Sequence, residues 1–242
     1  KKKKMKPARV EGASADDQAW YRPSTDKSPR MQTQTTSYGF HYAAIRKPIK
    51  NASTHNYLRI TEFIAPFMSL IPPNNNYNVA SVIVPIDDET TAFHFVAWGG
   101  KKCPSTEDWR KFNHARPGID LDEKWRSRRT LENNFLQDRQ AMKLGNFTGV
   151  PGIPNQDIIM WVSMGKTVNR TDDLLGASDL AIVEFRRLMV DAARKVAEGG
   201  KAIGTEEPRI PHACIASREG VYSKETDWRT LADATEQIDA AE

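Results

Sequence analysis

The sequence has few of the residues that several common kinds of site require. It contains only two cysteines, Cys103 and Cys214, in unrelated contexts, which excludes a disulfide framework and a thiolate metal site. It also has no apolar run of about 18 residues that could span a bilayer. These absences favour a protein of the reducing cytoplasm with no membrane partner.

Most motifs of conventional catalysis are absent as well. Residues 165–167 read GKT, like the end of a phosphate-binding loop, but Met160 stands where that loop requires its first glycine. No Gly-x-Ser-x-Gly elbow occurs. The five histidines include no pair at metal-ligand spacing, and each is expected to be a packed or surface residue.

The positive charge of the chain is concentrated at one end. The formal net charge is +4, but Lys1 to Lys4 and Lys6 carry five positive charges, which leaves residues 7–242 at −1. Such a lysine run is typical of a solvated terminal segment. The remaining composition, 39% hydrophobic and 27% charged, is that of an ordinary globular protein, so no nucleic-acid partner is expected.

The order of the predicted elements indicates an α+β fold. Residues 1–35 are polar and are expected to form an irregular segment leading into a domain over residues 36–242. Aromatic and β-branched residues predict strands at 38–46, 57–65, 67–71, 77–86 and 91–98. Helices are expected at 106–115, 134–144, 155–164 and 179–198. The short connections favour an antiparallel β-sheet flanked by helices.

The helix predicted at residues 179–198 has the clearest signals. Ser178 can cap its N-terminus, and apolar residues recur at helical spacing from Ile182 to Val196. Gly199 offers a left-handed stop.

One carboxylate has an unusual setting. If residues 134–144 form a helix, Asp138 lies beside Phe135, Ala141 and Met142 on a mostly apolar face. An unpaired carboxylate is costly to bury, so Asp138 requires a cationic partner or a metal. The spacing alone leaves both open, with an internal ion pair to an arginine as the alternative to a metal site.

Two arginines are candidates for binding a carboxylate. In an alternating strand, Arg59 shares its face with Tyr57, Thr61 and Phe63, and so points toward an aromatic-lined space. Arg22 precedes a proline, which holds its backbone extended. A guanidinium in partly apolar surroundings suits a planar carboxylate, because two N–H groups meet two oxygens. A surface salt bridge is the alternative for each arginine.

Six stretches of the sequence carry a resemblance to a known family. They are YGFHYAAIR (38–46), IPPNN (71–75), VPIDDE (84–89), QDRQAM (137–142), NQDIIMWVSMG (155–165) and LGASDLAIVEFRR (175–187). They resemble the C-terminal catalytic domain of the phthalate 4,5-dioxygenase oxygenase components, which are Rieske-type, non-haem-iron, aromatic-ring-hydroxylating oxygenases. The similarity covers about residues 7–229, and so nearly the whole chain.

The resemblance implies a helix-grip (START-like) fold and a mononuclear Fe(II) held by two histidines and one carboxylate. Asp138, by its place in QDRQAM, matches the family's carboxylate ligand, and Arg22 and Arg59 match the region that holds the substrate carboxylates. The family's Asp-x-x-His-x-x-x-x-His segment, expected just before the lysine run, does not occur in this sequence. Nor do the Cys and His pairs of a Rieske 2Fe-2S cluster. We therefore expect an N-terminal Rieske domain outside these residues, and an inactive fragment without it.

The activity implied by the resemblance is the addition of dioxygen to an aromatic carboxylate such as phthalate, giving a cis-dihydrodiol. Electrons are expected from NADH through a flavin and iron-sulfur reductase, and the expected assembly is a homotrimer or a stacked hexamer. Two alternatives stay open. One is an O-demethylase or monooxygenase acting on a substituted aromatic acid, and the other is a non-catalytic helix-grip module that only binds such a ligand.

Overall fold

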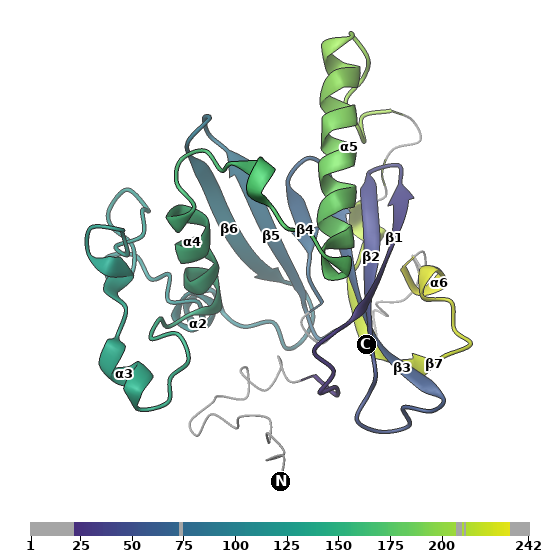
Figure 1. The fold of residues 1–242 in the computed structure, drawn as a ribbon, viewed down its shortest axis with the longest axis horizontal. Coiled ribbons are helices and arrows are strands. Elements are labelled where there is room, and N and C mark those ends of the chain that lie inside the picture. Colours follow the sequence, from purple (N-terminus) through teal and green to yellow (C-terminus); the bar gives the residue numbers. More distant parts are fainter. Residues whose placement is uncertain (1–21, 73–74, 207–209, 211, 233–242) are drawn as a thin grey trace.

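The computed structural model describes residues 22–72, 75–206, 210 and 212–232. They form a seven-stranded antiparallel sheet with helices packed on it, which confirms the predicted α+β helix-grip fold (Figure 1). The strands are β1 (Arg30–Thr36), β2 (Gly39–Arg46), β3 (His55–Ile64), β4 (Met68–Leu70), β5 (Asn78–Pro85), β6 (Thr91–Trp98) and β7 (Arg218–Ser223). The helices are α2 (Thr106–Phe112), α3 (Arg139–Lys143), α4 (Ile153–Ser163), α5 (Leu180–Ala197) and α6 (Trp228–Ala232).

Strands β1 to β6 follow one another across the sheet in chain order, each antiparallel to the next. Strand β7 departs from this order. It pairs with residues 55–60 of β3, while β4 pairs with residues 62–64 on the same edge of β3. Two strands that are far apart in the sequence therefore share one edge of a central strand.

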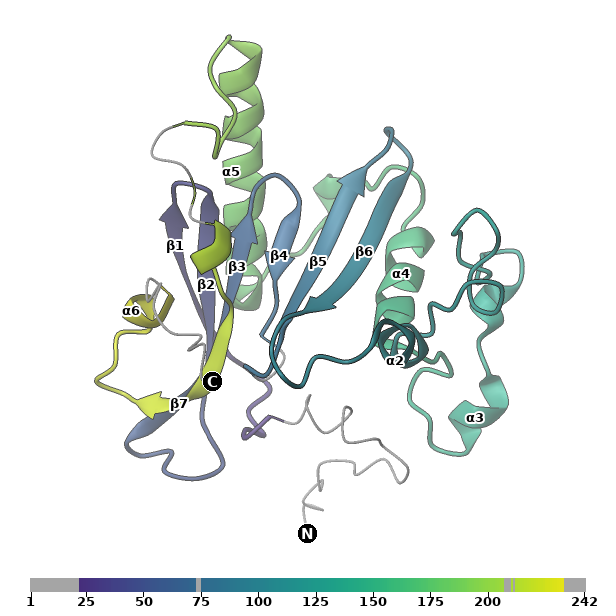
Figure 2. The same cartoon turned by 180° about the vertical axis from the view of Figure 1, so that it is seen from behind.

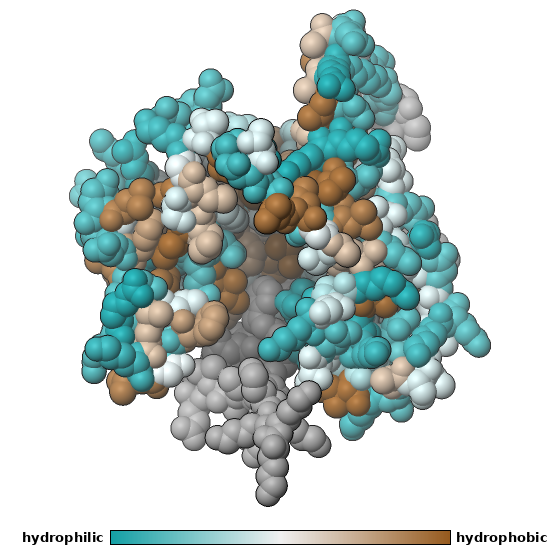
Figure 3. Space-filling model, viewed as in Figure 1, coloured by the Kyte–Doolittle hydropathy of each residue, from teal (hydrophilic) through white to brown (hydrophobic). Residues whose placement is uncertain are grey.

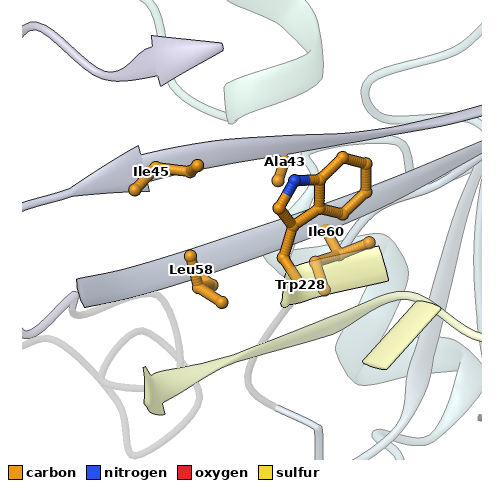
Figure 4. Packing of buried hydrophobic residues seen from close by; sticks show 5 residues of the cluster. All are labelled: Ala43, Ile45, Leu58, Ile60 and Trp228. Carbon is orange, nitrogen blue, oxygen red and sulfur yellow. The ribbon is translucent and has the colours of Figure 1, made fainter. Parts of the chain in front are cut away.

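Strands β2 and β3 are covered on both faces of the sheet, as Figures 1 and 2 show from opposite sides. On one face, Phe40 and Phe63 pack against α5, where the rings of Phe63 and Phe185 meet edge-on with centroids 5.1 Å apart. On the other face, Trp228 of α6 covers an apolar cluster (Figure 4). That cluster consists of Ala43, Ile45, Leu58 and Ile60. Burial from both sides makes this the core of the domain.

Strands β5 and β6 are covered more sparsely. Phe93 meets Trp161 of α4 edge-on, and Phe95 stacks on Trp109 of α2, so these helices cover one face of β6. On the opposite face of β6, Val96 and Trp98 are 42% and 41% exposed. No helix in the described parts of the chain is long and apolar enough to cross a membrane.

The boundaries of two predicted segments need correction. The sequence placed residues 1–35 in an irregular segment, but β1 starts at Arg30 and pairs along its whole length with β2, so residues 30–35 belong to the sheet. Helix α5 starts one residue later than predicted, and Ser178 does not cap it. Asp179 occupies the N-cap position, and its carboxylate accepts from the backbone N–H of Gly176 at 2.8 Å. Gly199, with φ of +85°, provides the predicted left-handed stop.

Candidate functional site

A row of paired residues crosses one face of the sheet beneath a hollow. Phe63, Ser69, Ser81 and Phe95 occupy successive cross-strand pairs from β3 to β6, so their side chains point to the same face. Helix α5 covers the Phe63 end of the row and helix α2 the Phe95 end. The two serines are small and leave space above the middle strands. Figure 3 shows hydrophobic residues gathered around a hollow in the middle of this face.

Aromatic side chains stand on the same face beside the serines. Phe93 and Phe95 alternate along β6, and their rings lie with centroids 6.2 Å apart. Trp161 meets Phe93 at 5.2 Å, and Trp109 stacks on Phe95 at 5.2 Å. The indole Nε1 of Trp109 donates to the carbonyl of Phe95 at 2.7 Å, so its polar atom is satisfied. This arrangement offers apolar walls to a planar aromatic ligand.

A charged cluster lies on the same face, toward the start of β3. Tyr57, Arg59 and Phe63 alternate along β3 as the sequence predicts. Arg59 Nε donates to Glu219 Oε2 at 3.1 Å, and Arg59 Nη2 donates to the carbonyl of Pro72 at 2.7 Å. The side chains of Arg59 and Glu219 are 12% and 11% exposed, so their ion pair is largely removed from water. The salt bridge considered as an alternative for Arg59 is therefore present, but it is not a surface one.

Tyr57 and Asn75 hold Glu219 in place within this cluster. The Tyr57 hydroxyl donates to Glu219 Oε2 at 2.7 Å. Burial, reinforced by this hydrogen bond, raises the pKa of Tyr57 well above its usual value, so Tyr57 is a neutral donor. The Asn75 side chain meets the backbone of Glu219 twice, donating to its carbonyl at 2.6 Å and accepting from its N–H at 2.9 Å. Glu219 is therefore fixed by both its side chain and its backbone.

Arg22 reaches the same cluster from the segment before β1. Desolvation lowers the pKa of Arg22, and repulsion from Arg59 and Arg46 lowers it further, while Tyr57 and Glu219 oppose this. Arg22 stays exposed to solvent, so the shift indicates nearness to the cluster rather than full burial. The structure thus brings together the two arginines that were singled out from the sequence.

The sequence reasoning missed two members of the cluster, Glu219 and Arg46. Glu219 lies 160 residues from Arg59, on a strand that was not predicted, so no local pattern could have connected the two. Arg46 ends β2 directly opposite Tyr57, and paired residues of neighbouring strands point to the same face. The register of β2 against β3 was therefore the signal that could have identified Arg46.

The setting predicted for Asp138 is wrong. Residues 134–144 do not form one helix, because Asn134, Phe135 and Leu136 have φ values of 50°, 55° and 50°, outside the right-handed region. Asp138 is the N-cap of the short helix α3, and its Oδ1 accepts from the backbone N–H of Ala141 at 2.8 Å. It is exposed to solvent rather than buried on an apolar face. The argument that burial forces a partner on Asp138 therefore does not hold.

A second carboxylate lies on α4, near the hollow. Desolvation raises the pKa of Asp157. Asp157 precedes Trp161 by one helical turn on α4, so both side chains lie on the side of α4 that meets the sheet at Phe93. Like Asp138, Asp157 is exposed to solvent.

The described residues do not complete a metal site by themselves. They contain no group of three His, Cys, Asp or Glu side chains able to hold a metal ion. His41 is buried and committed to Gln34, with Nε2 and Oε1 3.0 Å apart, and to Glu62, with Nδ1 and Oε2 3.5 Å apart. Asp138 and Asp157 can each offer one carboxylate to an ion whose remaining ligands come from elsewhere.

Comparisons with known proteins place this arrangement in a family. A family model described as "LigXa C-terminal domain like" matches residues 1–242. The oxygenase subunit of phthalate 4,5-dioxygenase from Pseudomonas putida is 58% identical over 224 residues, which are 92% of this chain and 51% of that protein. The oxygenase subunit of 3-chlorobenzoate-3,4-dioxygenase from Comamonas testosteroni is 31% identical over 222 residues, which are 84% of this chain and 50% of that protein.

These matches confirm the resemblance inferred from the six sequence stretches. The chain spans about half the length of the two relatives. Because the family model extends over every residue of the sequence, the chain belongs to the LigXa C-terminal domain-like family.

Proposed function

We propose that this chain is the catalytic part of an oxygenase that adds dioxygen to an aromatic carboxylate such as phthalate, giving a cis-dihydrodiol. The observation that supports this most strongly is that one face of the sheet carries an aromatic-walled hollow and an arginine cluster whose Arg59–Glu219 ion pair is largely removed from water. An aromatic acid requires both features, one for its ring and one for its carboxylate. The names of the two relatives refer to phthalate and 3-chlorobenzoate, which are aromatic carboxylates.

In this proposal the ring lies over Ser69 and Ser81, and the carboxylates meet Arg22 and Arg59. Arg59 uses Nε and Nη2 within the protein, while its Nη1 has no hydrogen-bond partner among the described residues. Arg22 likewise has no hydrogen bond or ion pair to the described part of the chain. Both guanidinium groups therefore have N–H donors free for a planar carboxylate. Tyr57 and Glu219 hold Arg59 still, which reduces the entropy lost on binding.

The proposed chemistry requires a mononuclear Fe(II), which activates dioxygen when it is bound. We propose that this chain supplies one carboxylate ligand, and that two histidines and a Rieske 2Fe-2S cluster come from sequence outside these residues. Asp138 is the candidate by motif. Asp157 is the alternative, because it belongs to the helix that borders the hollow. This chain's own contribution is to bind the ring, orient its carboxylates and exclude water around it.

The partners in this proposal are dioxygen and an NADH-dependent flavin and iron-sulfur reductase. We propose a homotrimer or a stack of two trimers in the cytoplasm as the working assembly.

Product analysis tests the reaction. The full-length protein, supplied with reductase, NADH, phthalate and isotopically labelled dioxygen, is expected to form a dihydrodiol that carries two labelled oxygens. A product with one labelled oxygen, or formaldehyde from a methoxylated acid, would identify a monooxygenase or demethylase instead. Tight binding of phthalate with no product would identify a ligand-binding module.

Metal analysis of two matched variants decides the carboxylate ligand. In full-length protein, replacing the true ligand by alanine is expected to remove mononuclear iron and leave the cluster in place. We expect this result for Asp138→Ala, with Asp157→Ala retaining its iron-to-cluster ratio. The reverse result would make Asp157 the ligand, and an unchanged ratio in both variants would exclude both residues.

A further inference from the structure

Arg46 is a half-buried charged group in the site for which the proposed function so far gives no role. One of its terminal nitrogens, Nη1, is inaccessible to solvent and has no hydrogen-bond partner among the described residues. A guanidinium N–H left in this state costs free energy, because its hydration is lost without replacement. Such a donor is expected to have an acceptor in the working protein.

Arg46 lies on the same face of the sheet as Arg59, next to the arginine cluster. Arg46 is paired with Tyr57 across β2 and β3, and Ala44 is paired with Arg59, so Arg46 stands one step further along the same face. Ala44 between them is small, which leaves the space above the strand to the two arginines. The carbonyl of Pro23 accepts from the backbone N–H of Ile49 at 2.8 Å, which holds the Arg22 segment beside the end of β2 that carries Arg46.

The charges in this region do not balance. Among the described residues, Arg22, Arg46 and Arg59 face one carboxylate within the cluster, that of Glu219, which leaves two positive charges in excess. Asp26 does not remove this excess. Its two carboxylate oxygens accept from the backbone N–H groups of Ser28 and Lys47, and the charge of Lys47 acts on it more strongly than that of Arg46 does. The positive charge of Lys47 offsets the negative charge of Asp26, so the two together leave the net charge of the region unchanged.

We propose that Arg46 is a specificity-determining residue that makes the site select aromatic dicarboxylates over monocarboxylates. Without Arg46 the excess charge of the cluster is one, which matches a benzoate-like monoanion. With Arg46 it is two, which matches a phthalate-like dianion, and the unpaired Nη1 meets an oxygen of the second carboxylate or of a water bound to it. This inference rests on the proposed function, since it assumes that an aromatic carboxylate occupies the cluster.

Binding measurements on the full-length protein, without reductase or NADH, test the proposal independently of turnover. Dissociation constants for phthalate and for benzoate are measured by calorimetry on the parent, Arg46→Gln, Arg46→Lys and a control, Arg194→Gln. Arg194 lies on α5 with its side chain 72% exposed, so the control removes the same charge from a solvent-exposed position outside the arginine cluster. Unfolding curves establish that each variant is folded.

We expect Arg46→Gln to bind phthalate about tenfold more weakly and benzoate within about threefold of the parent, while Arg194→Gln leaves both constants unchanged. Arg46→Lys keeps the charge and is expected to keep the preference for phthalate, with some loss because an ammonium lacks the guanidinium fork. If Arg46→Gln does not fold, Arg46→Lys decides alone, since loss of the preference with the charge retained contradicts the proposal. Equal weakening of phthalate and benzoate in Arg46→Gln would also overturn it. Failure of the parent to bind either acid would instead contradict the proposed function.

Discussion

The two halves of the sheet differ in how they are packed. Strands β2 and β3 are buried from both sides, by α5 on one face and α6 on the other, and most of their residues are inaccessible to water. Strands β5 and β6 are covered less completely: Val79 and Ala80 near the start of β5 are buried, but the residues of β6 are partly or fully exposed. The first half is a rigid support for charged side chains, while the second half leaves the space that a ligand can fill.

The strongest test of this difference is a pair of cavity-forming substitutions. Ile60 of β3 is 0% exposed within the cluster under Trp228, so Ile60→Ala is expected to lower the free energy of unfolding by about 2–5 kcal/mol. Val96→Ala on β6, where the side chain is 42% exposed, is expected to cost less than about 1 kcal/mol. Urea denaturation measures both. Equal losses would show that the two halves are packed alike.

Removing an arginine from the half around β2 and β3 is expected to weaken substrate binding and, where Glu219 loses its partner, folding as well. Arg59→Ala leaves Glu219 without its ionic partner and a substrate carboxylate without its donors, which is expected to cost about 2 kcal/mol, or roughly a thirtyfold rise in KM for phthalate. Arg22→Ala is expected to act in the same direction. Arg59→Lys should recover only part of the loss, because an ammonium cannot copy the two-pronged contact. Oxygen-uptake kinetics on phthalate within about twofold of the parent for both alanine variants would place the ligand elsewhere.

Filling the hollow above β5 is expected to weaken substrate binding less than removing an arginine does. Ser81→Leu adds apolar volume to the middle of the hollow, and we expect affinity for phthalate to fall about tenfold. Because the added side chain enters space that is already vacant, unfolding stability should change by less than about 1 kcal/mol. Ser223→Leu, on β7 outside the hollow, serves as a matched control. Unchanged affinity in Ser81→Leu would show that the ring does not lie over β5.

The smallest expected effect concerns the N-cap of α3, outside both halves of the sheet. Asp138→Ala removes the oxygen that accepts from Ala141, and is expected to lower the free energy of unfolding by about 1 kcal/mol. Asp138→Asn retains a capping oxygen and should lose little. Chemical denaturation compares the two. Equal stability of both variants and the parent would mean that the cap contributes nothing, and would leave the motif without a structural role.

Much of the fold could be predicted because local patterns determine it. The strand predicted at 91–98 coincides with β6, and the helix at 179–198 differs from α5 by one residue at each end. Strand β1 was missed because its sequence, RMQTQTT, is polar, and its strand conformation comes from pairing with β2. The helix at 134–144 was wrong because left-handed backbone at Asn134, Phe135 and Leu136 interrupts a run with helical periodicity. Side-chain periodicity does not report such an interruption.

The site was predicted less completely than the fold. The faces of Tyr57 and Arg59 followed from strand alternation, but the positions of Glu219 and Arg46 depend on which strands are neighbours. The desolvation that raises the pKa of Asp157 arises only in the folded chain, and no spacing rule measures it. The prediction that Asp138 lies on an apolar helix face was wrong because the predicted helix at 134–144 was wrong. An error in the local structure therefore led directly to an error in the site.

The shared edge of β3 has a consequence for how the protein is made. The carboxylate that holds Arg59 belongs to β7, which is synthesised long after the strand it joins. Until β7 has been synthesised, residues 55–60 of β3 therefore lack a partner strand on the edge that β4 shares. During that interval Arg59 also lacks the carboxylate of Glu219. Long-range pairing of this kind is slow, because the entropy of closing a large loop is lost before the contact forms. Binding competence is thus acquired last, and a chain released before residue 218 would have strands β1 to β6 and helices α2 to α5 but would lack α6 and the carboxylate that holds Arg59.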